Sequence, residues 1–243
     1  MSQHSFLRFT LPLVFLSSCS LANADNLIQG GFVDFNIYPH QTKVNNDTTF
    51  TINAFLNLSN RFSYFSLTNF SDQSDDGKLP NLDTFFTEQN LRWQISDTSP
   101  FEITVQSNLR SGSKNDRHRL GVRWSLNKSS FIAPLLNAIH LKYFINWHAI
   151  QFDHQENYVW QLEHAFSMTF PYISERLYLS GFADHTFNEN LPTAIPSNPI
   201  VAEAQLGYRL IPNTFAIAEY RVNQYRRSNV NNIAVGMEYK KTW

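Results

Sequence analysis

The sequence predicts an all-β protein, an antiparallel transmembrane β-barrel of about 12 strands. Apolar and polar residues alternate with a period of two over stretches of about ten residues, as in strands whose two faces meet different surroundings. The connectors between these stretches are long and short in turn. The chain also ends on such a stretch, with Val235, Met237 and Tyr239 at every second position before the terminal Trp243.

The first residues, MSQHSFLRFTLPLVFLSSCSLANADN, have the features of a secretory signal peptide. Arg8 precedes an apolar run, and small residues surround Ala24. The run is far shorter than the roughly 20 residues that a membrane-spanning helix needs. We therefore expect a signal peptide over residues 1–24 and an outer-membrane β-barrel over residues 25–243.

A second form of N-terminal processing stays open. The segment LSSC resembles the lipobox of bacterial lipoproteins, in which Cys19 would become the lipidated N-terminus. Cleavage after Ala24 is the expected form. Cys19 is the only cysteine, so a mature chain cut after Ala24 contains none, which excludes a disulfide-stapled fold.

The composition narrows the possible partners. The 243 residues are 42% hydrophobic and 15% aromatic, only 16% are charged, and the formal net charge is −1. A chain without an excess of basic residues lacks the electrostatic footprint of a protein that binds a nucleic-acid polymer. No segment after the predicted signal peptide holds about 18 consecutive apolar residues, so no transmembrane helix is expected.

Stretches with the two-residue period follow one another along the mature chain. In FFTEQNLRWQI, Leu91 and Trp93 alternate with Asn90 and Arg92, and FEITVQSNLR and VAEAQLGYRL repeat the pattern. The predicted strands lie near residues 27–38, 48–58, 61–70, 84–95, 100–110, 116–126, 138–150, 157–169, 174–186, 199–210, 214–224 and 231–243.

The connectors predict how these strands are arranged. NFSDQSDDGKLPNLD and TFNENLPTAIPSNP are long and polar, whereas SNR, SDTSP and IPNT are short. The connector NKSSFIAPLLNA is an exception, because it belongs to the short set but is long and partly apolar. Long loops at one end, with short turns and both termini at the other, are typical of outer-membrane barrels. A sheet in hydrocarbon must close on itself to pair its edges.

Closure explains the aromatic chain end. The last strand is expected to pair with the first, with Lys240 toward the lumen and Trp243 in the interfacial aromatic belt. The ending resembles the C-terminal assembly signal of bacterial barrels, although Lys241 stands where that signal has an apolar residue. The expected partners are therefore outer-membrane lipid, periplasmic chaperones and the barrel-assembly machinery.

A secreted β-sandwich or a lipocalin-like barrel is the soluble alternative, because their strands also have a period of two. The many aromatic residues near strand ends favour membrane girdles over a buried core. These residues are Tyr143, Trp147, Tyr158, Trp160, Phe170, Tyr208 and Tyr220.

Charged residues gather on the predicted lumen faces. Arginines come from the fourth to sixth strands, with Glu88 and Glu102 among them, and carboxylates come mainly from later strands. The arginines are Arg92, Arg110, Arg117, Arg119 and Arg123, and the later charges are Glu163, Asp184, Glu203, Glu219 and Glu238, with Arg209, Arg221 and Lys240. Such an arrangement fits a pore constriction with a transverse field. It fits equally a plug of salt bridges that fills a narrow barrel.

The sequence offers little for catalysis. Asp184 and His185 are adjacent on one strand, so their side chains face opposite sides and cannot easily cooperate. His140 and His148 could share the lumen with Glu163, but their spacing indicates no metal site. The strands that hold these histidines supply no His-x-Ser pair. We expect no enzyme activity, no catalytic residues, no metal and no cofactor.

Three segments carry a family resemblance. TINAFLNLSNRFSYFSLTNFSD, FFTEQNLRW and LYLSGFADHTF resemble, in order and character, the nucleoside-specific Tsx-like channels. This resemblance implies a twelve-stranded outer-membrane barrel with a narrow lumen, passive uptake of nucleosides or other small polar solutes, and a lumen lined with aromatic and polar binding residues. The alternative is a plugged structural or adhesive barrel that acts through its extracellular loops.

The residues expected to contact a solute are those on the predicted inward faces. They are Phe32, Asp34, Asn53, Phe55, Asn57, Glu88, Asn90, Arg92, Arg119, Arg123, Glu163, Glu203 and Glu219.

Overall fold

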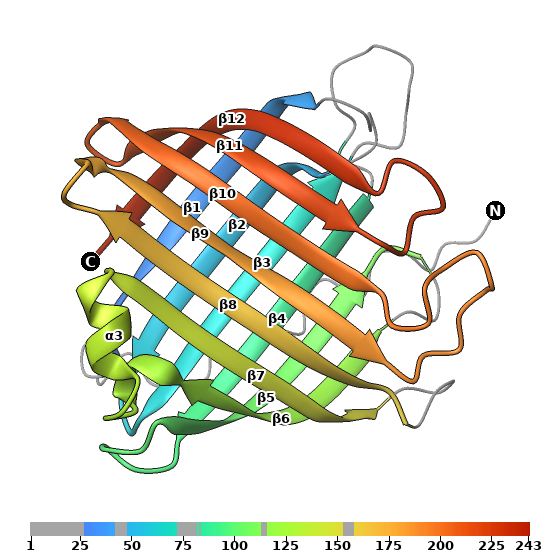
Figure 1. Cartoon of the computed structure of the whole chain (residues 1–243), viewed down its shortest axis with the longest axis horizontal. Helices are drawn as coiled ribbons and strands as arrows, with labels where there is room; N and C mark the ends of the chain where they lie inside the picture. Colours follow the sequence, from blue (N-terminus) through green and yellow to red (C-terminus); the bar gives the residue numbers. More distant parts are fainter. Residues whose placement is uncertain (1–26, 42–47, 72–81, 83, 113–115, 153–157) are drawn as a thin grey trace.

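The chain forms a closed antiparallel β-barrel of twelve strands (Figure 1). The computed structural model describes residues 27–41, 48–71, 82, 84–112, 116–152 and 158–243. Each strand pairs with its neighbours in sequence, and β12 pairs with β1 to complete the ring. The fold class predicted from the sequence is confirmed. The predicted signal peptide and Cys19 lie outside the described residues.

Every predicted strand is present, and no strand end differs from its predicted position by more than 3 residues. The strands are β1 (Ile28–Gln41), β2 (Thr48–Leu58), β3 (Phe62–Ser71), β4 (Thr84–Gln94), β5 (Phe101–Arg110), β6 (Arg117–Ser125), β7 (Leu141–Phe152), β8 (Trp160–Phe170), β9 (Ser174–Phe187), β10 (Ile200–Ile211), β11 (Thr214–Asn223) and β12 (Asn231–Thr242).

Alternation along each strand separates an apolar outer face from a polar inner face. On β5, Ile103 and Val105 are 40% and 46% exposed, whereas Thr104 and Gln106 are completely buried between them. Exposed apolar side chains at every second position form an outward belt around the barrel. An outer face of this kind is what a barrel surrounded by lipid requires.

Closure of the ring extends to the last residue. Asp34 faces Lys240 and Phe35 faces Tyr239 across the β1–β12 ladder. Beyond the end of β12, the backbone of Trp243 is hydrogen-bonded to that of Gly31. The aromatic chain end is therefore part of the closed ladder rather than a free terminus.

Short turns and long connectors lie at opposite ends of the barrel, as the connector lengths predicted. β1 begins and β12 ends at the short-turn end (Figure 1). The exceptional connector between β6 and β7 folds into η2 (Leu126–Lys128) and α3 (Ala133–Ala138), a feature that the sequence did not predict. Pro134 suits the first turn of α3, and Leu136 is the buried residue of this helix. Among the described residues, no helix has the length and apolar character needed to cross a membrane.

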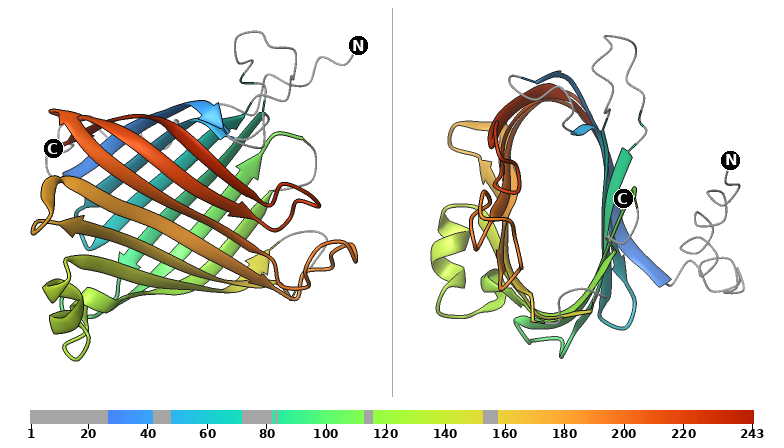
Figure 2. Two further views of the ribbon diagram at one scale, coloured as in Figure 1. Left: turned by 45° about the horizontal axis from the view of Figure 1, so that its top comes forward. Right: turned by 90° about the vertical axis from the view of Figure 1, so that its right-hand side faces the viewer.

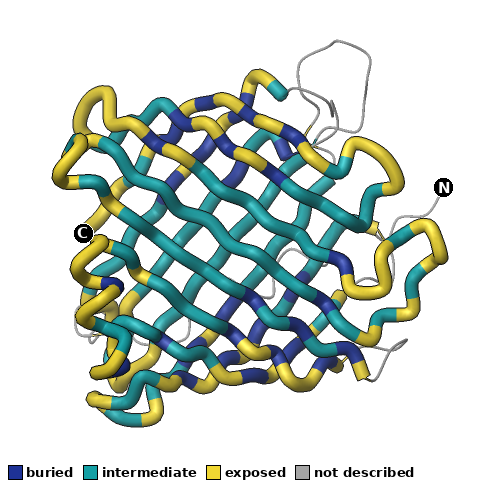
Figure 3. The backbone as a smooth tube through the Cα atoms, in the orientation of Figure 1, coloured by how far each residue is buried: buried dark blue, intermediate teal, exposed yellow. Residues whose placement is uncertain are grey.

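The barrel is flattened. Viewed along its axis its cross-section is an oval, with β1 and β12 at one curved edge and β6 and β7 at the other (Figure 2). Buried positions recur along the strands near these edges, while the walls between them are mostly half-buried (Figure 3). Side chains therefore fill the interior of the barrel next to its two curved edges.

The edge near β1 and β12 holds a small apolar cluster inside the barrel. Tyr38, Ile217 and Ala234 are buried together, and Phe215 packs against them. The ring of Tyr178 lies where a side chain at position 207 would be, so Gly207 makes room for it.

Candidate functional site: the lumen

A cavity of about 1390 Å³ occupies the centre of the barrel. All twelve strands contribute to its lining. At the short-turn end Arg61 and Lys142 line it, and at the long-connector end Glu189 and Tyr225 do. The cavity therefore reaches from one end of the barrel to the other.

The structure places twelve of the thirteen predicted contact residues on the lining of this cavity. These are Phe32, Asp34, Asn53, Phe55, Asn57, Glu88, Arg92, Arg119, Arg123, Glu163, Glu203 and Glu219. Asn90 does not line the cavity, although it is on the same face of β4. It is fully buried, and it donates a hydrogen bond to Glu88 Oε1 (2.7 Å) and accepts one from Gln106 Nε2 (3.4 Å).

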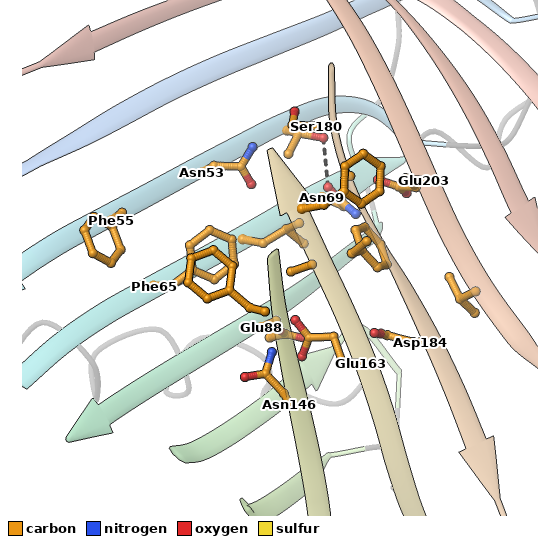
Figure 4. Close-up of a pocket in the computed structure, with 18 of the residues that line it drawn as sticks. Asn53, Phe55, Phe65, Asn69, Glu88, Asn146, Glu163, Ser180, Asp184 and Glu203 are labelled. Carbon is orange, nitrogen blue, oxygen red and sulfur yellow. Dashed lines mark hydrogen bonds between the residues drawn. The ribbon is translucent and has the colours of Figure 1, made fainter. Parts of the chain in front are cut away.

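An aromatic row runs across three neighbouring strands. Phe32, Phe55 and Phe65 are cross-strand partners on β1, β2 and β3, and the Phe32 and Phe55 rings stack with centroids 6.0 Å apart. Phe55 and Phe65 project into the lumen (Figure 4). A cationic side chain lies over the aromatic ring at each end of the row. Lys240 Nζ is 4.1 Å from the centre of the Phe32 ring, and the Arg92 guanidinium is 5.6 Å from the centre of the Phe65 ring.

Sequence reasoning missed Phe65. Its place directly across from Phe55 depends on the register of β2 against β3, which the sequence alone does not fix.

The edge of the lumen near β5, β6 and β7 is held by a polar network. Arg119 donates hydrogen bonds to Gln106 Oε1 (2.6 Å) and to Gln151 Oε1 (2.9 Å). Arg123 pairs with Glu102 at 3.3 Å, and its guanidinium lies 3.9 Å from the centre of the Phe144 ring. These contacts join neighbouring strands and fix both arginines against the wall.

Three carboxylates face one another at mid-lumen. Glu88, Glu163 and Asp184 come from β4, β8 and β9, and their side chains converge in Figure 4. Glu163 Oε2 lies 3.3 Å from His148 Nε2, so this histidine shares the lumen with Glu163 as the sequence suggested. His140 does not, because it lies in the turn before β7, against the ring of Tyr172.

Two further carboxylates, Glu219 and Glu238, are engaged by other side chains of the lumen. The Tyr38 hydroxyl donates to Glu219 Oε2 (2.7 Å) and also lies 2.9 Å from Gln205 Oε1, and Arg221 Nε lies 2.5 Å from Glu219. Glu238 accepts a hydrogen bond from Tyr178. Glu219 and Glu238 are therefore engaged by residues of β1, β9 and β11.

Arg209 departs from the predicted lumen charges. It is exposed at the short-turn end and is not among the residues that line the cavity.

A three-residue contact spans the long-connector end. Arg117 of β6 forms an ion pair with Glu189, which lies in the connector after β9, and the hydroxyl of Tyr225, in the connector after β11, donates to Glu189 Oε2 at 2.5 Å. Burial and the neighbouring Glu189 raise the pKa of Tyr225 to about 12, so its hydroxyl remains a donor at neutral pH. Sequence reasoning missed Glu189 because a loop residue shows no periodicity.

Asp184 and His185 do not form a catalytic pair. Asp184 lines the cavity, whereas His185 packs against Phe187 and lies 3.2 Å from the Asn198 carbonyl oxygen, so the two do not cooperate. Within the described part of the chain no group of three or more His, Cys, Asp or Glu side chains could hold a metal ion.

No protein-family model matches the chain, and no curated protein does. Among solved structures the chain is similar to the NanC porin, with 12% identity and a TM-score of 0.51 over 86% of this chain and 98% of that one. It is also similar to the KdgM porin, with 17% identity and a TM-score of 0.48 over 86% and 98%. Membership of the Tsx-like channels is not shown by these comparisons. At 12% identity, the likeness to the NanC porin establishes the barrel fold alone.

Proposed function

We propose that this chain is an outer-membrane channel through which small polar solutes diffuse passively. The observation that carries the proposal is the cavity of about 1390 Å³ whose lining includes residues of both barrel ends. A barrel filled only to make a rigid scaffold has no need of such a space. The lining is rich in charged, amide and hydroxyl groups, which replace part of the hydration of a polar solute as it passes.

The outer surface supports the proposed location. The exposed apolar belt needs lipid, and a closed barrel is the form in which strands span a membrane. The NanC porin, whose fold this chain shares, is named as a porin, which supports the proposal of a channel. The proposal includes export by the predicted signal peptide, and assembly by periplasmic chaperones and the barrel-assembly machinery.

Nucleosides are candidates among the small polar solutes. The row of Phe32, Phe55 and Phe65 offers ring faces to a base or sugar, with polar side chains beside it. Stacking of a base on an aromatic side chain contributes about 1–3 kcal/mol. The resemblance to Tsx-like channels suggests the same solutes. Passage of this kind is transport without catalysis.

One observation favours the plugged alternative. The Arg117–Glu189–Tyr225 contact ties two long connectors to the barrel wall at the mouth. If these connectors closed the mouth completely, the barrel would act as a scaffold for its loops and would conduct nothing.

A liposome-swelling experiment tests the proposed function. Liposomes containing the refolded barrel should swell in isosmotic arabinose and swell more slowly in larger sugars, because a narrow lumen sieves by size. Liposomes with the same amount of heat-unfolded protein serve as the control. No swelling in arabinose beyond that control would contradict the channel and favour the plugged scaffold.

A further inference from the structure

A row of lumen side chains changes from positive to negative charge along its length. Arg123, Asn146, Glu163 and Asp184 are cross-strand partners on β6, β7, β8 and β9. Neighbouring strands lie about 4.8 Å apart, so the row passes from a cation through an amide to two carboxylates within a short span. Glu88 reaches toward the acidic end from β4 (Figure 4).

Three of these charged residues, Arg92, Glu88 and Asp184, have no ion-pair partner among the described residues, although Glu88 accepts a hydrogen bond from Asn90. In the described part of the chain Arg92 forms no hydrogen bond or ion pair, although it is only 5% exposed, and its Nε is buried without an acceptor. Glu88 and Asp184, within the same described residues, have no cation within the 4.0 Å of an ion pair. Buried charges that the fold leaves unpaired are costly, which calls for an explanation in terms of a ligand.

Arg92 belongs to the basic side of the row. It pairs across strands with Thr104 of β5, two residues from Glu102, which is the cross-strand partner of Arg123, and both arginines line the same cavity. Two guanidinium groups at the basic end of the row can bind a carboxylate, because the planar guanidinium of arginine matches a carboxylate with two parallel hydrogen bonds. The three carboxylates on the other side form a place for an ammonium group.

Asn146 lies between the two sides. It is 1% exposed, and neither its Nδ2 nor its Oδ1 has a hydrogen-bond partner among the residues that the structure describes. It extends toward Glu88 and Glu163 (Figure 4), and Arg123 and Glu163 flank it in register. An amide in this position can donate to a carboxylate and accept from an ammonium group of the same molecule.

We infer that the middle of the lumen binds a zwitterionic solute of the α-amino-acid type, with its carboxylate toward Arg92 and Arg123 and its ammonium group toward Glu88, Glu163 and Asp184. This inference rests on the proposed channel and names a solute class for it. A solute with one charge satisfies one end of the row and leaves the other end unpaired. A neutral solute of the same size satisfies neither charge.

Block of ion current by added solutes tests the inference. The refolded protein is placed in a planar bilayer, and the concentration that halves the current is measured for serine, serinamide, N-acetylserine, arabinose and uridine. Serine is the zwitterion, serinamide lacks the negative charge, and N-acetylserine lacks the positive charge. We expect serine to block at about one tenth of the concentration needed for each of the other four, because the zwitterion makes at least one more charge-assisted hydrogen bond.

Two variants locate the site. Asn146→Leu removes the amide and keeps the branched shape of the side chain, and Arg92→Gln removes a cation that has no ion-pair partner among the described residues. Each should raise the half-blocking concentration of serine about tenfold. Asn69→Leu is the matched control, because Asn69 also lines the cavity from β3 but lies outside the row. It should leave the block by serine unchanged. Heat-dependent gel mobility verifies that each variant is folded.

The outcomes separate this inference from the proposed function. Absence of any ion current in the unmodified protein would overturn the channel itself. A current that all five solutes block equally would overturn the zwitterion site and leave the channel standing. Stronger block by uridine would assign the mid-lumen site to nucleosides, and stronger block by N-acetylserine or serinamide would make it a site for one charge. Preference for serine that Asn146→Leu and Arg92→Gln do not reduce would place the site elsewhere.

Discussion

Trp243 and Gly31 exchange two backbone hydrogen bonds: Trp243 N donates to Gly31 O at 3.2 Å, and Gly31 N donates to Trp243 O at 3.1 Å. The last residue of the chain thereby extends the seam between β12 and β1, on which closure of the barrel depends. A barrel without this seam has two open sheet edges, which a membrane does not tolerate.

The seam predicts how C-terminal changes affect assembly. Deletion of Trp243, or Tyr239→Asp on the outward face, should reduce the yield of assembled barrel far more than Lys240→Gln. Tyr239 is 48% exposed on the apolar belt, where a carboxylate would face lipid, whereas Lys240 lines the lumen. Assembled protein can be measured as the fraction that reaches the outer membrane. Equal yields of all three variants would contradict this role of the chain end.

Closure also predicts resistance to detergent. The protein should fractionate with the outer membrane, and in detergent gels it should migrate faster unheated than boiled, because every strand is paired on both sides. Recovery in the soluble periplasm, with the same mobility before and after boiling, is the result that the barrel account does not allow.

N-terminal processing is predicted from the sequence, since residues 1–26 lie outside the described part. We expect cleavage before Asp25, because a barrel held by its lipid-facing belt gains little from an acyl anchor. The mass of the purified protein decides between the two forms. A diacylated N-terminal Cys19 would show that the lipobox is used.

Two lumen arginines should respond differently to the same substitution. Arg92→Gln should change ion selectivity with little effect on stability, since Arg92 has no hydrogen bond or ion pair in the described structure. Arg119→Gln should cost about 1–3 kcal/mol of stability, because Gln106 and Gln151 on the adjacent strands lose a buried charged partner.

Selectivity in planar bilayers and the unfolding temperature in detergent, measured for both arginine variants, test this difference. A large fall in unfolding temperature for Arg92→Gln with unchanged selectivity would mean that Arg92 is structural.

Strand positions could be predicted well because each strand has an apolar outer face and a polar inner face. Residues of the two faces alternate, so the sequence shows a period of two. The pattern also showed which residues face the lumen, including Arg92 and Glu163. It could not show that Asn90 is covered by its neighbours, or that Phe65 completes an aromatic row, because these depend on register and local packing. Nor could it reveal α3 or Glu189, which lie in connectors where no repeating pattern applies.

Ion conductance through the refolded protein in a planar bilayer tests the channel most directly, and Glu189→Ala makes the measurement specific to this structure. We expect discrete current steps from the unmodified protein. Larger steps are expected from Glu189→Ala, because the two long connectors lose their contact with Arg117 and each other at the mouth. Conductance in neither protein, although both show the heat-dependent mobility of a folded barrel, would contradict the channel.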